Sequence, residues 1–402
     1  MQAEKRSPYL GAKRMDDIRP SAIRSIMERT ACLKKQGADV VDLSVGEPDF
    51  NTPEPIKRAT IQAIANNHSH YVSNRGVLDL RKAIAEMLLR EYGLHYNPET
   101  EILVTTGGAE AINNAIMANV GENDEVIIPE PAFVNYKYVT VEAGAVPVLI
   151  PLSPESGFQL DIAQIEAAIT PRTRMIVLNN PNNPTGAVYP KKTLTEISDL
   201  ACKHDLLVLA DEMYSKILYG KSDFVSISSI SGMRDRSIVI NGFSKTYAMT
   251  GWRLGYLYAD ERLINNIVRI HQYSTTNTAA FIQVGVAASM NTPETSAAVQ
   301  EMIDEFAHRR ELFLSELSKV PLLKCIAPLG SFFIVVDTSG TGLDGTEFSR
   351  RLLEEKFVSA VPVIGLGGST ANWMRCSFAV SDQKIVEGIR RIRELVAEVS
   401  GK

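Results

Sequence analysis

Short apolar segments alternate with segments of helical periodicity between about residues 100 and 240, and this alternation limits the possible folds more than any other feature of the sequence. The apolar segments cover residues 101–105, 125–128, 146–150, 174–178, 206–210 and 237–240. Helical segments are expected among them at residues 108–119, 161–169 and 194–204. Short buried strands that alternate with helices are typical of a mainly parallel sheet with helices on both faces. The sequence therefore predicts an α/β fold.

The two ends of the chain show a different pattern. After residue 261 the chain is helical to about residue 317, and a smaller set of strands and helices follows. Before residue 54 we expect one helix and one short strand. These segments predict a smaller α+β domain that is formed by both ends of the chain. The predicted divisions are residues 54–298 for the large domain, residues 16–53 and 299–402 for the small domain, and residues 1–15 for an N-terminal arm.

The charge pattern argues against nucleic acids and membranes as partners. The formal net charge is -5, and charged residues of both signs are interspersed rather than gathered into a basic patch. No apolar run approaches the ~20 residues that a membrane-spanning helix requires. The N-terminal residues also lack the apolar segment that a signal peptide needs.

The cysteines and histidines suggest neither a disulfide framework nor a metal site. The four cysteines lie far apart and form no Cys-x-x-Cys pair, so we expect buried thiols in a reducing compartment. The six histidines show no ligand spacing, and no residue is assigned to a metal. A cytoplasmic protein is the prediction.

Polar residues follow several of the predicted strands. In parallel sheets ligands bind at the carboxyl ends of the strands, so these residues are candidates for a site. Gly107 and Gly108 open a helix, where backbone amides can bind an anion. Asp211 directly follows a buried strand, and a carboxylate in such a place is costly unless it is paired or caps a helix. Taken alone, the segment 179–186, Asn-Asn-Pro-Asn-Asn-Pro-Thr-Gly, favours a plain turn.

The segment 240–255 carries the strongest chemical signal. It lies between two apolar runs, as expected for a loop between buried strands, and it contains Lys245 and Arg253. A lysine amine can form a Schiff base, and an arginine guanidinium can bind a phosphate. Together with Asp211, these groups suit pyridoxal 5'-phosphate: the carboxylate for the ring nitrogen, the amine for the aldehyde, and the guanidinium for the phosphate.

At this point the sequence resembles a known family, the class I aminotransferases of fold type I, which includes aspartate and aromatic aminotransferases. The resemblance extends over about residues 18–398. It rests on the motifs LSVGEPDFNTP, HYVSNRG, TTGGAEA, PNNPTGAVY, LADEMY, NGFSKTYAMTGWRLGY and MRCSFA. The resemblance implies a large domain with a mainly parallel, seven-stranded sheet covered by helices, together with a smaller α+β domain.

The resemblance also implies roles for residues that would surround the cofactor ring. Lys245 matches the lysine that holds the cofactor and then moves a proton at the substrate. Asp211 matches the carboxylate that keeps the pyridine nitrogen protonated. Tyr214 and Asn183 match the groups that hydrogen-bond the phenolate oxygen, and Phe133 matches the aromatic residue stacked on the ring.

Other matched residues would bind the phosphate. Gly108 and Ala109 match its backbone donors, and Ser244 and Arg253 match its side-chain partners. Tyr71 matches a tyrosine that reaches the phosphate of the neighbouring subunit, so the resemblance implies a homodimer with shared active sites.

The substrate end is implied by two further matches. Arg375 matches the arginine that binds the substrate α-carboxylate through a bidentate pair, with help from the backbone at Gly46. Arg75 could point at a substrate, but a charge in a solvated loop is the favoured interpretation. A Gly-x-Gly-x-x-Gly pattern at residues 340–345 has no acidic residue at the distance that a dinucleotide site needs, so we interpret it as a surface loop.

The predicted function is transfer of an amino group from an L-amino acid, aspartate or an aromatic one, to a 2-oxo acid such as 2-oxoglutarate by a ping-pong route. Two departures from the family pattern bear on the substrate. Alanine stands at position 109, where some relatives carry a lysine for a distal carboxylate, and residues 361–373 replace a Pro-Gly-x-x-Phe segment. A lyase, deaminase or oxidase with the same cofactor is the alternative.

Overall fold

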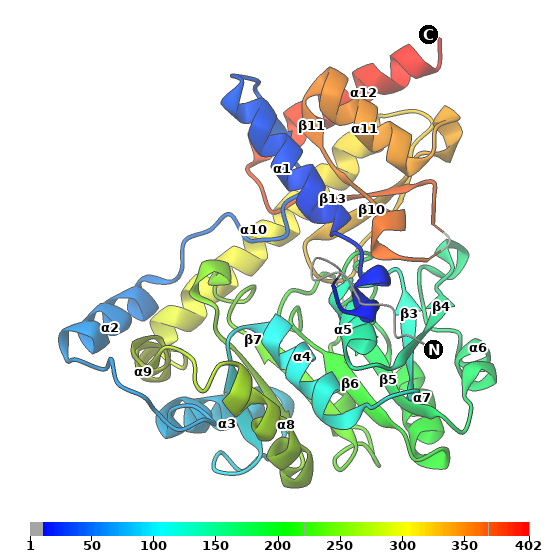
Figure 1. Cartoon of the computed structure of the whole chain (residues 1–402). Helices are drawn as coiled ribbons and strands as arrows, with labels where there is room; N and C mark the ends of the chain where they lie inside the picture. Colours follow the sequence, from blue (N-terminus) through cyan, green and yellow to red (C-terminus); the bar gives the residue numbers. More distant parts are fainter. Residues whose placement is uncertain (1–10, 221, 369, 402) are drawn as a thin grey trace, which may run out of the picture.

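The computed structural model describes residues 11–220, 222–368 and 370–401, and a seven-stranded sheet forms its centre (Figure 1). The order across the sheet is β2-β8-β7-β6-β5-β3-β4. Only β8 is antiparallel to its neighbours, so the predicted α/β fold with a mainly parallel sheet is confirmed. The strands are β2 (Ile102–Thr105), β3 (Glu125–Glu130), β4 (Val146–Pro151), β5 (Thr173–Asn179), β6 (Leu207–Asp211), β7 (Ser237–Gly242) and β8 (Gly255–Ala259).

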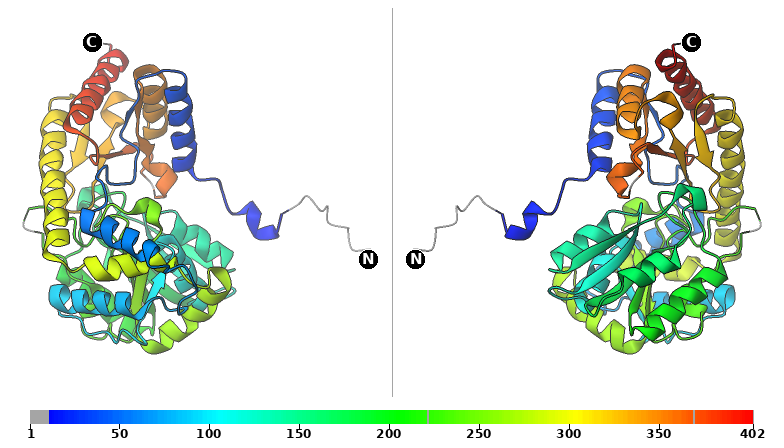
Figure 2. Two further views of the ribbon diagram at one scale, coloured as in Figure 1. Left: turned by 90° about the vertical axis from the view of Figure 1, so that its left-hand side faces the viewer. Right: turned by 90° about the vertical axis from the view of Figure 1, so that its right-hand side faces the viewer.

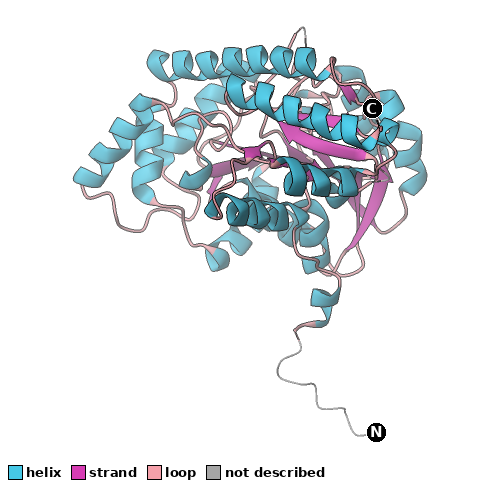
Figure 3. Ribbon diagram, turned by 90° about the horizontal axis from the view of Figure 1, so that it is seen from above, coloured by secondary structure: helices cyan, strands magenta, loops and turns pink. Residues whose placement is uncertain are grey.

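Helices cover both faces of this sheet because its buried strands point successive side chains to opposite sides. In β2, Ile102 and Val104 belong to one apolar cluster and Leu103 belongs to another. The first cluster includes residues of α3 (Leu78–Tyr92), α6 (Ile162–Ala168) and α7 (Lys191–Lys203). The second includes residues of α4 (Gly108–Asn119), α5 (Asn135–Glu142) and α8 (Glu261–Ser274). Figure 3 shows helices on both sides of the strands.

A second, smaller sheet has the order β12-β13-β10-β9 and is antiparallel. It belongs to a third apolar cluster that also contains residues of α10, α11 and α12. Its strands are β9 (Lys324–Ile326), β10 (Phe333–Asp337), β12 (Val361–Pro362) and β13 (Trp373–Ser377). The helices are α10 (Pro293–Leu317), α11 (Gly345–Lys356) and α12 (Asp382–Val399).

Both ends of the chain contribute to this smaller unit. β1 (Val41–Asp42) pairs in parallel with β11 (Val358–Ser359), and α1 (Ala22–Lys35) lies beside the C-terminal helices (Figure 1). The remaining helices, α2 (Glu54–Ala65) and α9 (Ala280–Ser289), pack on each other beside the large sheet. The division at residues 54 and 298 stays a proposal, and its second boundary falls within α10.

The helix α10 runs along one side of the molecule past both units (Figure 2). Near its start Val299 belongs to the apolar cluster of the large sheet, whereas Phe306 and Phe313 belong to the cluster of the small sheet. The segment that contains the short turn Lys13–Asp16 extends away from the body of the chain. The rest of the predicted N-terminal arm, residues 1–10, lies outside the described residues.

Several expectations about local structure are corrected. The strand expected at residues 40–45 is only two residues long in β1, and α5 was not expected because its sequence, NYKYVTVE, has few helix-favouring residues. Cys32 and Cys202 are exposed rather than buried, since they lie on outer faces of α1 and α7. All four cysteines are free. No helix in the described parts of the chain is both long and apolar enough to cross a bilayer.

The Gly-x-Gly-x-x-Gly segment forms a short turn followed by the start of α11. The Asp344 carboxylate accepts a hydrogen bond from the Glu347 amide at 2.8 Å and so caps the helix. This negative group occupies the place where a dinucleotide phosphate would have to bind, and the segment is a loop, as predicted.

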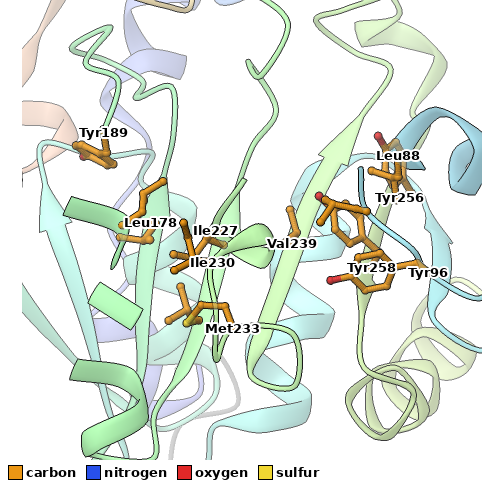
Figure 4. Close-up of a cluster of buried hydrophobic side chains, with 14 of the residues drawn as sticks. Leu88, Tyr96, Leu178, Tyr189, Ile227, Ile230, Met233, Val239, Tyr256 and Tyr258 are labelled. Carbon is orange, nitrogen blue, oxygen red and sulfur yellow. The ribbon is translucent and has the colours of Figure 1, made fainter. Parts of the chain in front are cut away.

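A carboxylic acid, Glu212, lies in the interior beside the large sheet. Its Oε1 accepts hydrogen bonds from the Ser226 hydroxyl at 2.9 Å and from the Ile227 amide at 3.1 Å, and Tyr258 lies at 3.4 Å from Oε2. Tyr258 is part of an aromatic group with Tyr96, whose ring centroid is 4.7 Å away (Figure 4). Burial among these neutral groups raises the pKa of Glu212 to about 8.

This raised pKa predicts how stability changes with pH. The folded chain keeps the proton on Glu212 up to pH about 8, whereas the ordinary pKa of 4.5 applies after unfolding. Unfolding therefore releases a proton within that window, and the Glu212 contribution falls as pH rises, by an amount on the order of several kcal/mol. In Glu212→Gln, which keeps the acceptor oxygen, the free energy of unfolding from urea titrations should fall less steeply with pH than in the wild type.

The exposed Glu301 provides the matched control, because Glu301→Gln should leave the pH dependence of the wild type unchanged. Parallel curves for wild type and Glu212→Gln across the window would contradict the assigned pKa.

Candidate active site

A cavity of about 350 Å³ lies at the carboxyl ends of the central strands, between the large sheet and the small one. This volume is within the range of small-molecule sites, ~300 to 1,000 Å³. Eleven of the twelve predicted site residues line it, although they come from many parts of the sequence. They are Gly46, Gly108, Ala109, Phe133, Asn183, Asp211, Tyr214, Ser244, Lys245, Arg253 and Arg375.

Lys245 enters the cavity from the loop between β7 and β8. Its Nζ donates a hydrogen bond to the carbonyl oxygen of Gly46 at 2.5 Å. Burial lowers the pKa of Lys245 to about 8, against the opposing effect of the Glu47 carboxylate. About a tenth of the amine is therefore neutral at pH 7, and this neutral form is the one that acts as a nucleophile or base.

Asp211 stands at the end of β6 with only neutral hydrogen-bond donors around its carboxylate. The Tyr136 hydroxyl donates to Oδ2 at 2.7 Å, and the Met213 amide donates to Oδ1 at 3.1 Å. Burial raises the pKa of Asp211, while these hydrogen bonds act in the opposite direction. A buried carboxylate in this setting becomes favourable when a cationic group enters the cavity.

Arg375 is on β13 of the small sheet, and its side chain is almost completely buried, with the residue 2% exposed. Its Nη1 donates to the Asn183 side-chain oxygen at 3.1 Å, and its Nη2 donates to the Ser44 carbonyl at 2.9 Å. Nε is buried and has no hydrogen-bond partner among the described residues. Burial lowers the pKa of Arg375 to about 10.

The Arg375 guanidinium also lies over the ring of Phe333, 4.3 Å from its centroid. All its recorded partners are neutral, so the cation is ready to bind an anion. Each Nη carries a second N–H besides the one bound by a protein oxygen, so the two Nη groups can face one carboxylate and a bidentate geometry is available. Arg375 is buried and its hydrogen-bond partners are neutral, so it does not form a surface salt bridge.

The start of α4 forms the opposite end of the cavity. Gly107 has φ +81°, and a Cβ placed on it would approach Nη2 of Arg253 to 2.6 Å. The absence of a side chain therefore lets the guanidinium lie against the helix start. Here the first amides, at Gly108 and Ala109, have no intrahelical partner. Ser244 lines the same cavity, so this end combines helix amides, a hydroxyl and a cation, as an anion site requires.

Tyr214 and Asn183 lie together beneath Arg375. A hydrogen bond from Asn183 opposes the effect of burial on Tyr214, whose pKa is nevertheless raised well above the ordinary value. The Asn183 amide donates to the Asn179 side chain at 2.7 Å, which fixes the turn after β5. The 179–186 segment is thus a turn that also delivers a side chain to the cavity.

Two residues named with the site do not line the cavity of this chain, and for one of them, Tyr71, the resemblance implies the site of the neighbouring subunit. Tyr71 does not line the cavity and is 88% exposed. Arg75 donates to the Thr100 carbonyl at 3.0 Å and to the Asn265 side chain at 2.5 Å. Arg75 is therefore neither a substrate contact in this chain nor a freely solvated loop charge, because its guanidinium is bound by protein groups.

Sequence reasoning missed several cavity residues. Tyr136 was passed over because it lies in the unexpected helix α5, where it forms an edge-on contact with Phe133, 5.9 Å between ring centroids. Glu47 lies within the motif LSVGEPDFNTP, whose sequence alone did not indicate a role for it. Its Oε2 accepts a hydrogen bond from the Thr250 hydroxyl at 2.6 Å. Three more come from the small unit and are brought to the cavity only by tertiary structure: Ile23, Met27 and Phe333.

Comparison with known proteins identifies the family. Residues 38–392 match the family model for aminotransferase class I and II. The aromatic-amino-acid aminotransferase 2 of Thermococcus litoralis is 38% identical over 386 residues, which cover 96% of this chain and 98% of that protein. The aspartate aminotransferase of Pyrococcus abyssi is 37% identical, with 96% and 98% covered.

Solved structures agree with the sequence comparison. The aspartate aminotransferase of Thermus thermophilus with maleate has a TM-score of 0.92 and 35% identity, covering 96% of this chain and 99% of that chain. The aromatic aminotransferase of Pyrococcus horikoshii has a TM-score of 0.88 and 37% identity, covering 93% and 99%. The chain therefore belongs to the class I and II aminotransferases, and it is an enzyme with the fold type I architecture.

Proposed function

We propose that this aminotransferase uses pyridoxal 5'-phosphate and transfers the amino group of an L-amino acid to a 2-oxo acid. The observation that carries the proposal is the charge arrangement of one cavity. A lysine of lowered pKa, a buried carboxylate without a cationic partner and an anion-binding helix start face the same space.

The residues present fit the cofactor at each of its functional groups. Asp211 offers a carboxylate for a protonated ring nitrogen, and Tyr136 holds that carboxylate in place. The start of α4, with Arg253 against Gly107, offers donors for a phosphate. Phe133 lines the cavity, as a ring-stacking residue must, and Tyr214 with Asn183 offers neutral hydrogen-bond donors for the phenolate oxygen.

When bound, pyridoxal 5'-phosphate supplies an electron-withdrawing ring that lowers the cost of removing a proton from the substrate Cα. Lys245 is the group in reach that can accept and return this proton. Its pKa of about 8 leaves part of the amine neutral near neutral pH, and the Gly46 carbonyl fixes its Nζ. Lys245 is therefore the proposed catalytic base.

Arg375 binds the substrate α-carboxylate in this proposal, with the backbone at Gly46 beside it. The guanidinium is held by Asn183 and Ser44, so little freedom is lost when the carboxylate binds. A carboxylate on the Nη groups would add charge-assisted hydrogen bonds, which are stronger than the bonds to the neutral partners present.

The remaining lining favours an aromatic donor over aspartate, the two donors that the sequence predicts. All three cations that line the cavity, Lys245, Arg253 and Arg375, are assigned to the amine, the phosphate and the α-carboxylate. The space beyond them is lined by the apolar Ile23 and Met27 and by the acidic Glu47. Among the described residues of this chain, a second substrate carboxylate would find no further cation in the cavity lining. An acceptor such as 2-oxoglutarate would depend on the neutral donors or on the partner subunit.

We also propose a homodimer with shared active sites. Tyr71 and Tyr273 are each 88% exposed, and Ile61 and Ile64 on α2 are exposed as well. Apolar and aromatic side chains exposed on neighbouring elements are typical of an interface. In this arrangement Tyr71 would reach the phosphate of the partner. A cytoplasmic location remains a proposal, consistent with four free cysteines.

Lys245→Ala should lower the turnover number by at least about 10³-fold, because it removes both the amine that holds the cofactor and the base. The borohydride-reducible visible absorption band should disappear with it. Lys203→Ala, which removes a surface lysine paired with Glu166, serves as the control and should behave like the wild type. An unchanged borohydride-reducible band in Lys245→Ala would contradict the assignment of Lys245 as the residue that holds the cofactor.

Arg375→Ala should reduce kcat/KM for all amino acid donors by a similar factor, about 10²-fold or more, since the carboxylate it binds is common to them. Steady-state kinetics with an aromatic, an aliphatic and an acidic donor test this. Arg350→Ala, on an exposed face of α11, is the control. A loss restricted to one class of side chain would instead place Arg375 at the side-chain end of the substrate.

The substrate assignment is tested by a panel of donors with 2-oxoglutarate, oxaloacetate and pyruvate as acceptors. Aromatic donors should give higher kcat/KM values than aspartate. Ala109→Lys, which adds a cation to the cavity lining, should shift the ratio of kcat/KM values towards aspartate by about tenfold. Ala109→Met has a side chain of similar length without charge and should not. A wild type that prefers aspartate would contradict the role given to the apolar lining.

A further inference from the structure

A carboxylate that takes no part in the proposed reaction, Glu110, lies behind the start of α4. Its Oε1 accepts hydrogen bonds from Nδ1 of His271 at 2.9 Å and from the Thr275 hydroxyl at 2.6 Å. Its Oε2 accepts a hydrogen bond from the backbone amide of Thr106. The Glu110 side chain is 11% exposed and the His271 side chain is 0% exposed. This network joins the first turn of α4 to the end of α8.

The Glu110 carboxyl is ionised in this network. Burial would raise its pKa, but hydrogen bonds from His271, Thr275 and Thr106 outweigh that effect and lower the pKa to about 2. An ionised carboxylate can only accept hydrogen bonds, so Nδ1 of His271 carries the proton between the two groups. The carboxylate is at the positive end of the α4 dipole, which adds to its stability.

The network determines which donors of the helix start remain available. The Thr106 amide donates a hydrogen bond to the Glu110 carboxylate, and the Thr106 hydroxyl lies 2.9 Å from the hydroxyl of Thr278. The next residues, Gly107 and Gly108, have no side chains that could fix their conformation. Thr106 is therefore held on the side away from the cavity, while the amides of Gly108 and Ala109 face it beside Arg253.

The strand β8 packs closely against the loop at Gly107 and Gly108 and leaves it little room to move. A Cβ placed on Gly255 of β8 would lie 2.8 Å from the carbonyl carbon of Gly107 and 2.9 Å from the nitrogen of Gly108. The loop is thus in contact with β8 on one side and anchored to α8 by Glu110 on the other. If the hydrogen bonds of Glu110 are weakened, Gly107 and Gly108 can shift only within the space between β8 and α8. The backbone amides that face Arg253 would then shift with them.

We propose that Glu110, together with His271 and Thr275, is a positioning group for the phosphate-binding amides and sets the affinity for the phosphorylated cofactor. This inference rests on the proposed use of pyridoxal 5'-phosphate. It predicts that the network acts on the phosphate end alone, because Asp211 and Lys245 bind the opposite end of the ligand and contact none of its members.

The test compares two ligands that differ only in the phosphate. Dissociation constants of pyridoxal 5'-phosphate and of pyridoxal are measured on the apoenzyme by equilibrium dialysis, and the bound phosphate is observed by ³¹P NMR. In Glu110→Gln one donor faces an amide nitrogen instead of an oxygen. The affinity for pyridoxal 5'-phosphate should fall about tenfold, the affinity for pyridoxal should stay the same, and the ³¹P resonance should shift.

Two further variants separate positioning from other effects. Thr275→Val removes one donor but keeps the charge, and it should weaken pyridoxal 5'-phosphate selectively in the same direction. It also provides the test if Glu110→Gln does not fold. Glu347→Gln makes the same change in the first turn of α11, away from the cavity, and should alter neither constant.

Three results would overturn the positioning role of Glu110. Tighter binding of pyridoxal 5'-phosphate to Glu110→Gln would show that the negative charge of Glu110 only repels the phosphate, and it would overturn the inference. Equal loss of both ligands, or no loss of either, would overturn it as well while leaving the cofactor proposal intact. A wild type that binds pyridoxal without any preference for the phosphorylated form would overturn both proposals.

Discussion

The pairing of β7 with β8 is the constraint on which the site depends. These antiparallel neighbours place Gly242 opposite Gly255, and the chain between them must turn back within a short loop. The loop is closed by a hydrogen bond from the Phe243 amide to the Leu254 carbonyl and is anchored by the buried Phe243 and Met249. It therefore presents its polar side chains to the cavity with little freedom. One strand pair thus sets the distance between the amine of Lys245 and the guanidinium of Arg253.

Among the described residues, Asp211, Lys245 and Arg375 form no hydrogen bond with a side chain of opposite charge. Asp211 has hydroxyl and amide partners, Arg375 has carbonyl partners, and Lys245 donates to a backbone oxygen. Buried charges without a hydrogen-bonded partner of opposite charge are costly, so this arrangement lowers the free energy of unfolding of the protein on its own. Ligand groups of opposite sign recover that cost on binding. Affinity and orientation are then obtained from the same interactions, since each end of the ligand can match only one part of the cavity.

The sequence was sufficient to predict the large sheet because its strands are short apolar runs separated by helices, and to predict the cavity residues that directly follow them. Asp211 and Lys245 are of this kind. Other features depend on distant parts of the chain. β11 and β12 are two residues long each and exist only through their pairing with β1 and β13. Tyr136 could not be assigned because nothing near it in the sequence indicates a contact with Asp211.

The long helix α10 has a mechanical consequence. With 25 residues and a rise of about 1.5 Å each, it is roughly 38 Å long. It is anchored to the large sheet near its start through Val299 and to the small sheet through Phe306 and Phe313. A tilt of a few degrees about Val299 would move its far end, 18 residues or about 27 Å away, by about 2 Å, and β10 and β13 of the same apolar cluster would move with it. Because Arg375 is on β13, such a tilt would change the distance between Arg375 and the large sheet.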